Sequence, residues 1–124
     1  MIDFTNNDFI KLREVDIDSI SKNIYDLLIP GEEIISSYKA LRDYCVFTNK
    51  RVIAVNVQGV TGKSKDYTSL PYSKINTFSV ETSGVLDLDS ELELYYSGLG
   101  KVRFEFTNSK SILKISKIIS EYLL

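Results

Sequence analysis

Six basic side chains in the middle of the chain are the first candidates for binding chemistry. Residues 39–65 contain six basic residues and one acidic residue, although the whole chain has a net charge of −2. Lysine and arginine bind phosphate and carboxylate groups when several of them face one ligand. The sequence therefore offers a candidate anion-binding set, and lysines that only keep a domain soluble are the alternative. The set consists of Lys39, Arg42, Lys50, Arg51, Lys63 and Lys65.

A run of acidic residues is the second candidate. Residues 81–93 contain five acidic residues and no basic residue. On a strand, alternate residues share one face but lie about 6.5 Å apart, which is too far for several carboxylates to converge on one cation. We therefore interpret the run as a solvated face or as an acidic surface between subunits. The candidate interface residues are Asp87, Asp89, Glu91, Glu93 and Tyr95.

Several kinds of catalytic chemistry are excluded or disfavoured by the residue types. The chain has no histidine, so no histidine-based triad, metal ligand or pH switch exists within it. Cys45 lies in an apolar run without a nearby base, which favours an inert thiol. The stretch from Gly59 to Ser64 is two residues shorter than a phosphate-binding P-loop and precedes a strand pattern. We therefore expect no catalytic residues, no metal and no cofactor.

Length and composition fit one small globular domain spanning residues 1–124. The chain is 44% apolar and 26% charged, and no apolar run approaches the ~20 residues that span a bilayer. The first residues do not resemble an export signal, and a single cysteine fits a reducing compartment, so we expect a cytoplasmic protein. The acidic pI of about 5.2 argues against nucleic-acid binding.

The ends of the chain have helical patterns. Apolar residues spaced by three and four predict a helix over residues 16–28, which Pro30 and Gly31 would end. A shorter helix over residues 4–12 is a weaker expectation, so residues 1–30 are expected to form an N-terminal helical segment. A second amphipathic helix should begin at Asn108 or Ser109 and fill residues 108–124. Its apolar stripe comprises Ile112, Ile115, Ile118, Ile119, Tyr122 and Leu123.

Between the helices, the apolar residues recur with a period of two. This pattern predicts seven strands within residues 31–107, and the last two alternate most cleanly. The expected strands lie at about 33–40, 44–48, 51–58, 66–70, 75–82, 87–96 and 101–106. Short antiparallel strands followed by one helix suggest a bent sheet or barrel whose open end the helix covers.

Four motifs in this order resemble the bacterial pleckstrin-homology (PH) domain family. Residues 46–55 are similar to its VFTNKR-type hairpin, and residues 58–63 to its QG(L/V)TGKK loop. Residues 70–82 are similar to its IPYxxI…FSVET strand, and residues 87–92 to its DLDAEL segment. The resemblance implies a mainly β (α+β) fold, a PH-like seven-stranded bent antiparallel barrel with a C-terminal capping helix and an N-terminal helical extension. It also implies a self-assembling domain for which no catalytic residues are established.

Two functional hypotheses follow. The first is a non-catalytic interaction module that assembles into a ring of more than two identical subunits, with another protein as a further partner. In this hypothesis the basic block of one subunit faces the acidic strand of the next. The alternative is a peripheral anionic-lipid or phospholigand-binding domain that uses the six basic residues. The sequence disfavours lipid headgroups, because Lys39-x-x-Arg42-Asp43 departs from the basic pattern of phosphoinositide-binding PH domains.

Overall fold

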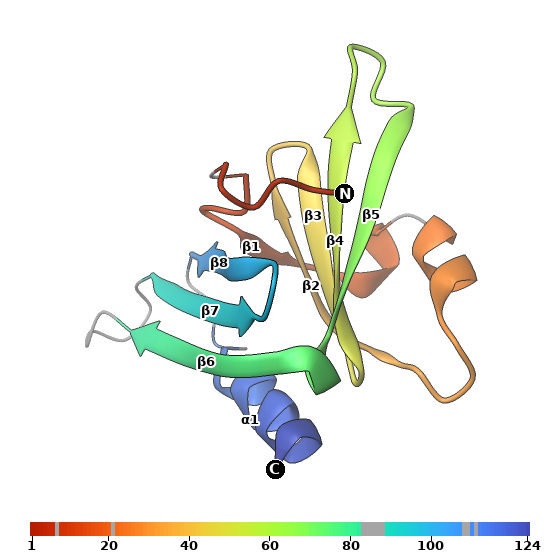
Figure 1. Cartoon of the computed structure of the whole chain (residues 1–124). Coiled ribbons are helices and arrows are strands. Elements are labelled where there is room, and N and C mark those ends of the chain that lie inside the picture. The colour runs from red at the N-terminus through yellow and green to blue at the C-terminus, as the bar shows by residue number, and fades with distance from the viewer. Residues whose placement is uncertain (7, 21, 83–88, 108–109, 111) are drawn as a thin grey trace.

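Two antiparallel β-sheets and one C-terminal helix enclose the main core (Figure 1). The computed structural model describes residues 1–6, 8–20, 22–82, 89–107, 110 and 112–124. One sheet has the strand order β1-β2-β3-β4-β5 and the other has the order β6-β7-β8. The strands are β1 (Arg13–Val15), β2 (Ile34–Ala40), β3 (Asp43–Thr48), β4 (Arg51–Gln58), β5 (Ser64–Pro71), β6 (Ile75–Thr82), β7 (Ser90–Tyr96) and β8 (Gly100–Phe106). This architecture confirms the expected mainly β fold with a C-terminal helix.

The centre of the larger sheet is buried on both faces, which explains the continuous apolar run in β4. Val52 and Ala54 belong to the core between the two sheets. Ile53 and Val55 point to the opposite face and belong to a second apolar cluster. Successive side chains of a strand alternate between faces, so such a run indicates two covered faces.

The N-terminal segment covers the second face, but it is not the continuous helix that the spacing predicted. It forms two short 3₁₀ helices, Ile17–Ser19 and Lys22–Leu27, separated by extended backbone at Ile20 (φ −82°, ψ 146°). The Asp16 side chain accepts a hydrogen bond from the Asp18 amide (3.1 Å). This bond caps the first 3₁₀ helix, because it satisfies one of the free amides at the start of that helix. Ile20 and Ile24 still pack into the second cluster.

Residues 9–15 bridge the two sheets in place of the short helix expected over residues 4–12. The Leu12 amide donates to the Glu105 carbonyl (2.9 Å), and the Thr107 amide donates to the Leu12 carbonyl (2.7 Å), so this segment runs beside β8. The chain then enters β1, which pairs with β2. The described residues therefore contain eight strands, one more than expected, because the sequence pattern gave no sign of this long-range pairing.

Helix α1 (Ile112–Leu123) lies against one end of the space between the sheets (Figure 1). Ile112, Ile115 and Ile119 are buried, as the apolar stripe predicted. Tyr122 is half exposed, and its ring lies 6.2 Å from that of Tyr72, in the short turn before β6. The cap expected at residues 108–109 lies outside the described residues.

Candidate functional site

The six basic candidates lie at two opposite ends of the larger sheet. Consecutive antiparallel strands reverse direction, so the β2–β3 turn and the β4–β5 loop share one end, whereas the β3–β4 turn lies at the other. Arg42 and Lys63 lie in the first two connections, and Lys39 and Lys65 are close to them on β2 and β5. Lys50 and Arg51 are at the far end. The structure therefore does not bring the six together as one site.

Arg51 belongs to an internal hydrogen-bond network rather than to an open anion site. Its Nε and Nη2 donate to the two carboxylate oxygens of Glu32, each at 2.9 Å. Nη1 donates to the Ser69 hydroxyl (2.9 Å), and Nη2 also donates to the Leu27 carbonyl (2.6 Å). The guanidinium is thereby occupied by groups of its own chain.

The carboxylate of Glu32 is the centre of this network, and its side chain is fully buried. Besides Arg51, it accepts from the Thr48 hydroxyl (2.7 Å) and the Ile29 amide (3.1 Å). Burial alone would raise the pKa of Glu32, but the hydrogen bonds from Arg51, Thr48 and Ile29 outweigh it and hold the pKa below its usual value. The network is a structural device that fixes the N-terminal segment to β3 and β4.

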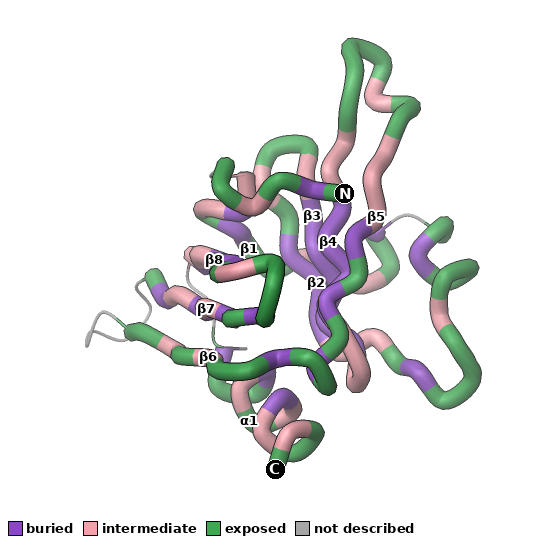
Figure 2. The backbone as a smooth tube through the Cα atoms, viewed as in Figure 1, coloured by how far each residue is buried: buried purple, intermediate pink, exposed green. Residues whose placement is uncertain are grey.

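At the opposite end, two hairpin tips present aliphatic side chains to solvent. Leu41 is 97% exposed and Val60 is fully exposed, and Figure 2 shows the exposed tip of the β4–β5 hairpin. An Nη2 hydrogen bond from Arg42 to the Gly59 carbonyl (2.5 Å) ties the two tips together. Arg42 and Lys63 flank the aliphatic residues, so this end combines apolar tips with positive charge.

Two further basic residues, Lys11 and Arg13, were missed among the candidates. Arg13 lies directly opposite Lys39 in the β1–β2 register. Together with Lys11 they line a groove of about 540 Å³ between the N-terminal segment and the β2–β3 hairpin. Residues 11–15 run polar, apolar, polar, polar, apolar, so the sequence holds no strict alternation that would have indicated a strand here.

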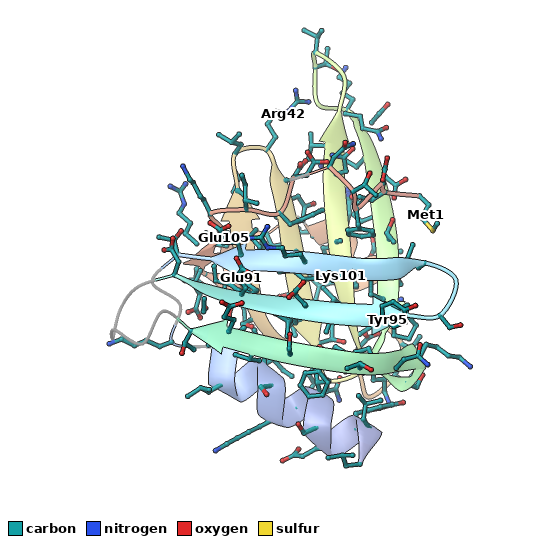
Figure 3. The ribbon with its side chains drawn as sticks, turned by 60° about the vertical axis from the view of Figure 1, so that its left-hand side comes forward. Met1, Arg42, Glu91, Tyr95, Lys101 and Glu105 are labelled. Atoms are coloured by element: carbon teal, nitrogen blue, oxygen red, sulfur yellow. The ribbon has the colours of Figure 1, made fainter. Side chains whose placement is uncertain are left out.

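The acidic candidates on β7 are largely neutralised by β8 of the same subunit. Lys101 pairs with Glu93 (3.2 Å), and Arg103 pairs with Glu91 and with Glu105 (3.4 Å to the latter). Figure 3 shows Glu91, Lys101 and Glu105 along these two strands, well separated from Arg42. Glu91 and Glu93 therefore contribute less net charge to a subunit surface than the sequence suggested.

The remaining interface candidates differ in their placement. Asp89 is exposed, and it lines a shallow depression together with Glu81, Glu91 and Glu105. Tyr95 is 49% exposed on the same sheet (Figure 3), whereas Asp87 lies outside the described residues. Within the part of the chain that the structure describes, no group of three or more acidic or cysteine side chains could hold a metal ion.

The two other features weighed for chemistry have structural explanations. Cys45 is completely buried, and the burial strongly raises the pKa of its thiol, which keeps it protonated and unreactive. In the glycine-bearing loop, Gly59 and Gly62 have positive φ angles (79° and 69°) and lead into β5 rather than a helix. The loop is a hairpin turn, not a nucleotide cradle.

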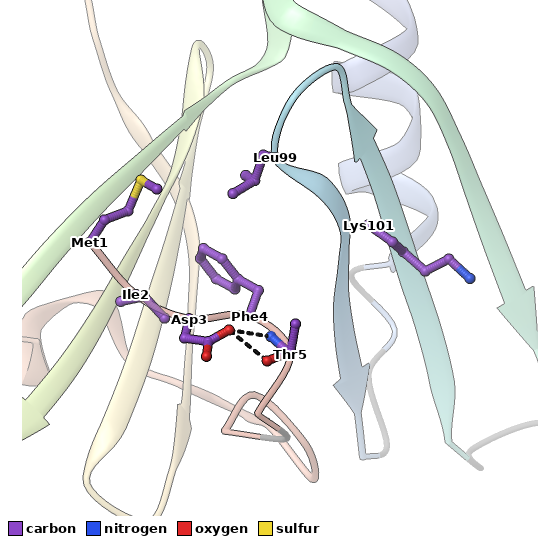
Figure 4. A pocket seen from close by; sticks show the side chains of 7 residues that line it. All are labelled: Met1, Ile2, Asp3, Phe4, Thr5, Leu99 and Lys101. Carbon is purple, nitrogen blue, oxygen red and sulfur yellow. Dashed lines mark hydrogen bonds between the residues drawn. The ribbon is translucent and has the colours of Figure 1, made fainter.

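A small pocket of about 300 Å³ lies beside the first five residues (Figure 4). Its apolar side chains come from Met1, Ile2, Phe4 and Leu99, and Lys101 stands at its margin. The Asp3 carboxylate accepts from the amide (3.0 Å) and the hydroxyl (2.6 Å) of Thr5, so its hydrogen-bonding capacity is partly used locally.

Comparison with known proteins identifies the family. The model of the bacterial PH domain matches residues 3–123, nearly the full length of the chain. The chain belongs to the bacterial PH domain family. The resemblance inferred from the four sequence motifs is thereby confirmed.

This PH domain has relatives and solved structures of similar length. It is 41% identical over 104 residues to the uncharacterized protein YjqA of Bacillus subtilis, covering 82% of this chain and 83% of YjqA. A DUF1696 family protein with a PH domain from Shewanella loihica superposes with a TM-score of 0.71 at 37% identity, covering 93% of this chain and 99% of that one. A PH domain from Shewanella amazonensis gives a TM-score of 0.62 at 40% identity, with 89% and 90% covered.

The helices of this PH domain bear on whether it could span a membrane. No helix among the described residues is long and apolar enough to cross a bilayer. Helix α1, with 12 residues, is amphipathic and packs on the core.

Proposed function

We propose that this bacterial PH domain is a non-catalytic interaction module that self-associates head to tail into a ring of more than two subunits. The observation that carries the proposal is the pair of open sheet edges. Among the described residues, β5 has only β4 as a neighbour and β6 has only β7, and both edge strands are eight residues long. An open edge presents unpaired backbone groups that can pair with another chain.

The two edges differ in charge, which favours a contact between unlike surfaces. Lys63 precedes β5 and Lys65 is its second residue, whereas Glu81 is the last residue but one of β6 and Asp89 precedes β7. Glu81 and Asp89 make no ion pair with any described residue, so their charge is available to a neighbouring subunit. Contact between unlike surfaces is heterologous, and such contacts close into rings when the rotation per subunit divides a full turn.

The chemistry of the described residues supports a non-catalytic module. The thiol of Cys45 is buried and protonated, and burial also raises the pKa of the Tyr72 hydroxyl, which donates to the Thr48 carbonyl (2.7 Å). The carboxylate of Glu32 forms an ion pair with Arg51. The groups most shielded from water are therefore held in unreactive states, which suits a structural rather than a catalytic role.

Light scattering of the full chain in solution tests the ring. We expect the wild type to show a mass that is more than twice 14.1 kDa. The double variant Glu81→Lys with Asp89→Lys should shift the mass towards the monomer, because like charges would then meet at the contact. Glu121→Lys reverses one exposed acid on α1, outside both edge strands, and as the control should keep the mass. A wild-type monomer or a two-fold dimer would contradict the ring.

A second candidate function, peripheral binding to an anionic lipid surface, is favoured by the two hairpin tips. Leu41 and Val60 are exposed beside Arg42 and Lys63, so aliphatic side chains and positive charge meet at one end. Burial of one such side chain in a lipid interface contributes about 1.5–3 kcal/mol, and each nearby cation adds about 1 kcal/mol on an anionic bilayer.

Vesicle sedimentation tests this candidate. We expect binding to vesicles that contain phosphatidylglycerol and a loss of binding as salt rises. Leu41→Glu with Val60→Glu should abolish it, whereas Leu113→Glu, on the exposed side of α1, should change it little. If the wild type remains in the supernatant at low salt, the lipid candidate is wrong.

A further inference from the structure

The groove between the N-terminal segment and the β2–β3 hairpin concentrates positive charge from two distant parts of the sequence. Lys11, Arg13 and Lys39 line its approximately 540 Å³ volume. Arg13 and Lys39 are direct cross-strand partners, so their side chains leave the sheet on the same face. All three residues are exposed, and none forms an ion pair or a side-chain hydrogen bond within the described part of the chain.

This pairing of like charges costs stability in the free protein. Residues directly opposite each other on antiparallel strands have Cβ atoms about 4.5–5.5 Å apart, and two cations there repel each other. Among the described residues no acidic side chain forms an ion pair with Arg13 or Lys39, and Lys11 lines the same groove. A bound anion would convert the repulsion into attraction.

Backbone geometry sets the position of Lys11, the third cation of the groove. Lys11 has a φ of 53°, a left-handed conformation that is uncommon for residues other than glycine. It is held there because its neighbours pair with β8: the Glu105 amide donates to the Phe9 carbonyl (3.0 Å) and the Leu12 amide donates to the Glu105 carbonyl (2.9 Å). The position of Lys11 is therefore set by the connection between the sheets.

Two acidic residues also line the groove and limit its charge. The Asp43 carboxylate accepts hydrogen bonds from the Val57 amide (2.9 Å) and the Asn56 side chain (3.2 Å), which orients it towards β4. Asp8 makes no such bond within the described residues. Three cations against two carboxylates leave a net charge of about +1 in a groove of a size typical for small ligands.

We propose that this groove binds an anion that carries a phosphomonoester group. Arg13 supplies a planar pair of donors that can bind two phosphate oxygens, and Lys11 and Lys39 supply point charges for the remaining oxygen. The proposal goes beyond both proposed functions, because the phosphate contacts use neither sheet edge and none of Arg42, Val60 and Lys63. The ligand is either a soluble phosphomonoester or the headgroup of phosphatidic acid, whose bilayer the exposed Leu41 at the rim would contact.

Calorimetric titration of the full chain with glycerol 3-phosphate tests the soluble source. Sedimentation with phosphatidylcholine vesicles, with and without phosphatidic acid, tests the lipid source. We expect binding in at least one arm, and we expect Arg13→Gln with Lys39→Gln to weaken it about tenfold or more, as loss of charge-assisted hydrogen bonds does. Asp8→Asn should strengthen it. In the lipid arm alone, Leu41→Glu should also weaken binding.

Two matched double variants separate the groove from general charge effects. Lys114→Gln with Lys117→Gln changes the net charge equally on the exposed face of α1, and Arg42→Gln with Lys63→Gln does so at the tip. Both should keep the affinity for glycerol 3-phosphate within about twofold of the wild type, and the α1 variant should also keep vesicle binding. An equal loss in either control, or binding of neither ligand by the wild type, would overturn the proposal.

A thermal measurement supplies a second readout that does not depend on titration. Without ligand, Arg13→Gln with Lys39→Gln should melt at the same or a higher temperature than the wild type, because the repulsion between the two cations is removed. Glycerol 3-phosphate should raise the melting temperature of the wild type but not of this variant. A variant that melts markedly lower without ligand would contradict the repulsion on which the proposal rests.

Discussion

Arg51 donates two hydrogen bonds to the fully buried carboxylate of Glu32, Nε to Oε2 and Nη2 to Oε1, both at 2.9 Å. Glu32 lies just before β2 and Arg51 opens β4, so the pair joins two strands that are not neighbours in the sheet. The same guanidinium reaches the Leu27 carbonyl in the N-terminal segment (2.6 Å). This one ion pair therefore connects three parts of the domain.

Removing the Glu32 carboxylate should destabilise the fold strongly. Glu32→Ala leaves the guanidinium of Arg51 without its partner, and breaking one side of a buried pair costs about 3–5 kcal/mol. Glu93→Ala, which breaks the exposed pair with Lys101, is the control and should cost at most about 1 kcal/mol. Urea denaturation at neutral pH measures both free energies of unfolding. Similar values for the two variants would contradict the structural importance of this network.

The same carboxylate should make stability depend on pH. Because the folded pKa of Glu32 is lowered, its contribution is present above the ordinary glutamate pKa of about 4.3 and is lost as the pH falls through the lower folded-state value. We expect Glu32→Gln to lose less stability than the wild type over that acid range. Denaturation midpoints at a series of pH values measure this difference, and parallel curves would show that Glu32 does not contribute.

The N-terminal segment can be tested with two residues of its apolar pattern. Ile24 is completely buried in the second cluster, whereas Leu27 is 40% exposed. Ile24→Ala should therefore cost about 2–5 kcal/mol, and Leu27→Ala considerably less. Thermal or chemical denaturation distinguishes them. Equal effects would mean that the segment does not pack on the outer face of the larger sheet.

The β4–β5 loop offers a matched pair of glycines. Gly62 has a φ of 69°, and an added Cβ would lie 3.3 Å from Val57 Cγ1. Gly59 has a φ of 79° and no atom within 4 Å of such a Cβ. The left-handed conformation should destabilise both alanine variants by about 1–2 kcal/mol, but only Gly62→Ala adds a close contact. Chemical denaturation should show Gly62→Ala as the less stable variant, and the reverse order would contradict the loop geometry.

Cys45 should report on opening of the core. Its thiol is buried and its pKa is raised, so a thiol reagent at pH 8 should react only when the sheet opens. We expect slow labelling of the native protein and immediate labelling in 6–8 M urea, conditions in which domains of this size are unfolded. Ile24→Ala should accelerate native labelling. Rapid labelling of the folded wild type would show that this thiol is accessible.

Elements with strict alternation were predictable because their signal is local. In β7 and β8, Leu92, Leu94, Val102 and Phe104 are buried between polar neighbours, as the period of two required. The apolar stripe of α1 was predictable for the same reason. Once the strands and their turns are known, the reversal of direction at each turn also places Arg42 and Lys50 at opposite ends of the sheet. The hypothesis of one six-residue anion site did not take this reversal into account.

The tertiary structure decided everything that depends on distant pairing. The spacing of Ile17, Ile20 and Ile24 suits an α-helix, but packing on the sheet is achieved by two 3₁₀ helices instead. The short pattern around Arg13 becomes a strand only because β2 is available as its partner, about 25 residues further along the chain.

The sequence by itself determined the family, the strands with a solvated face and the absence of histidine chemistry, since these depend on residue types and near-neighbour spacing. Only the folded chain could decide that Arg51 is taken up by Glu32, that Glu91 and Glu93 are paired with β8, and that Arg13 faces Lys39. The reason is physical: a charged side chain acts through whatever lies within a few ångströms of it, and that neighbourhood is set by strand register rather than by position in the sequence.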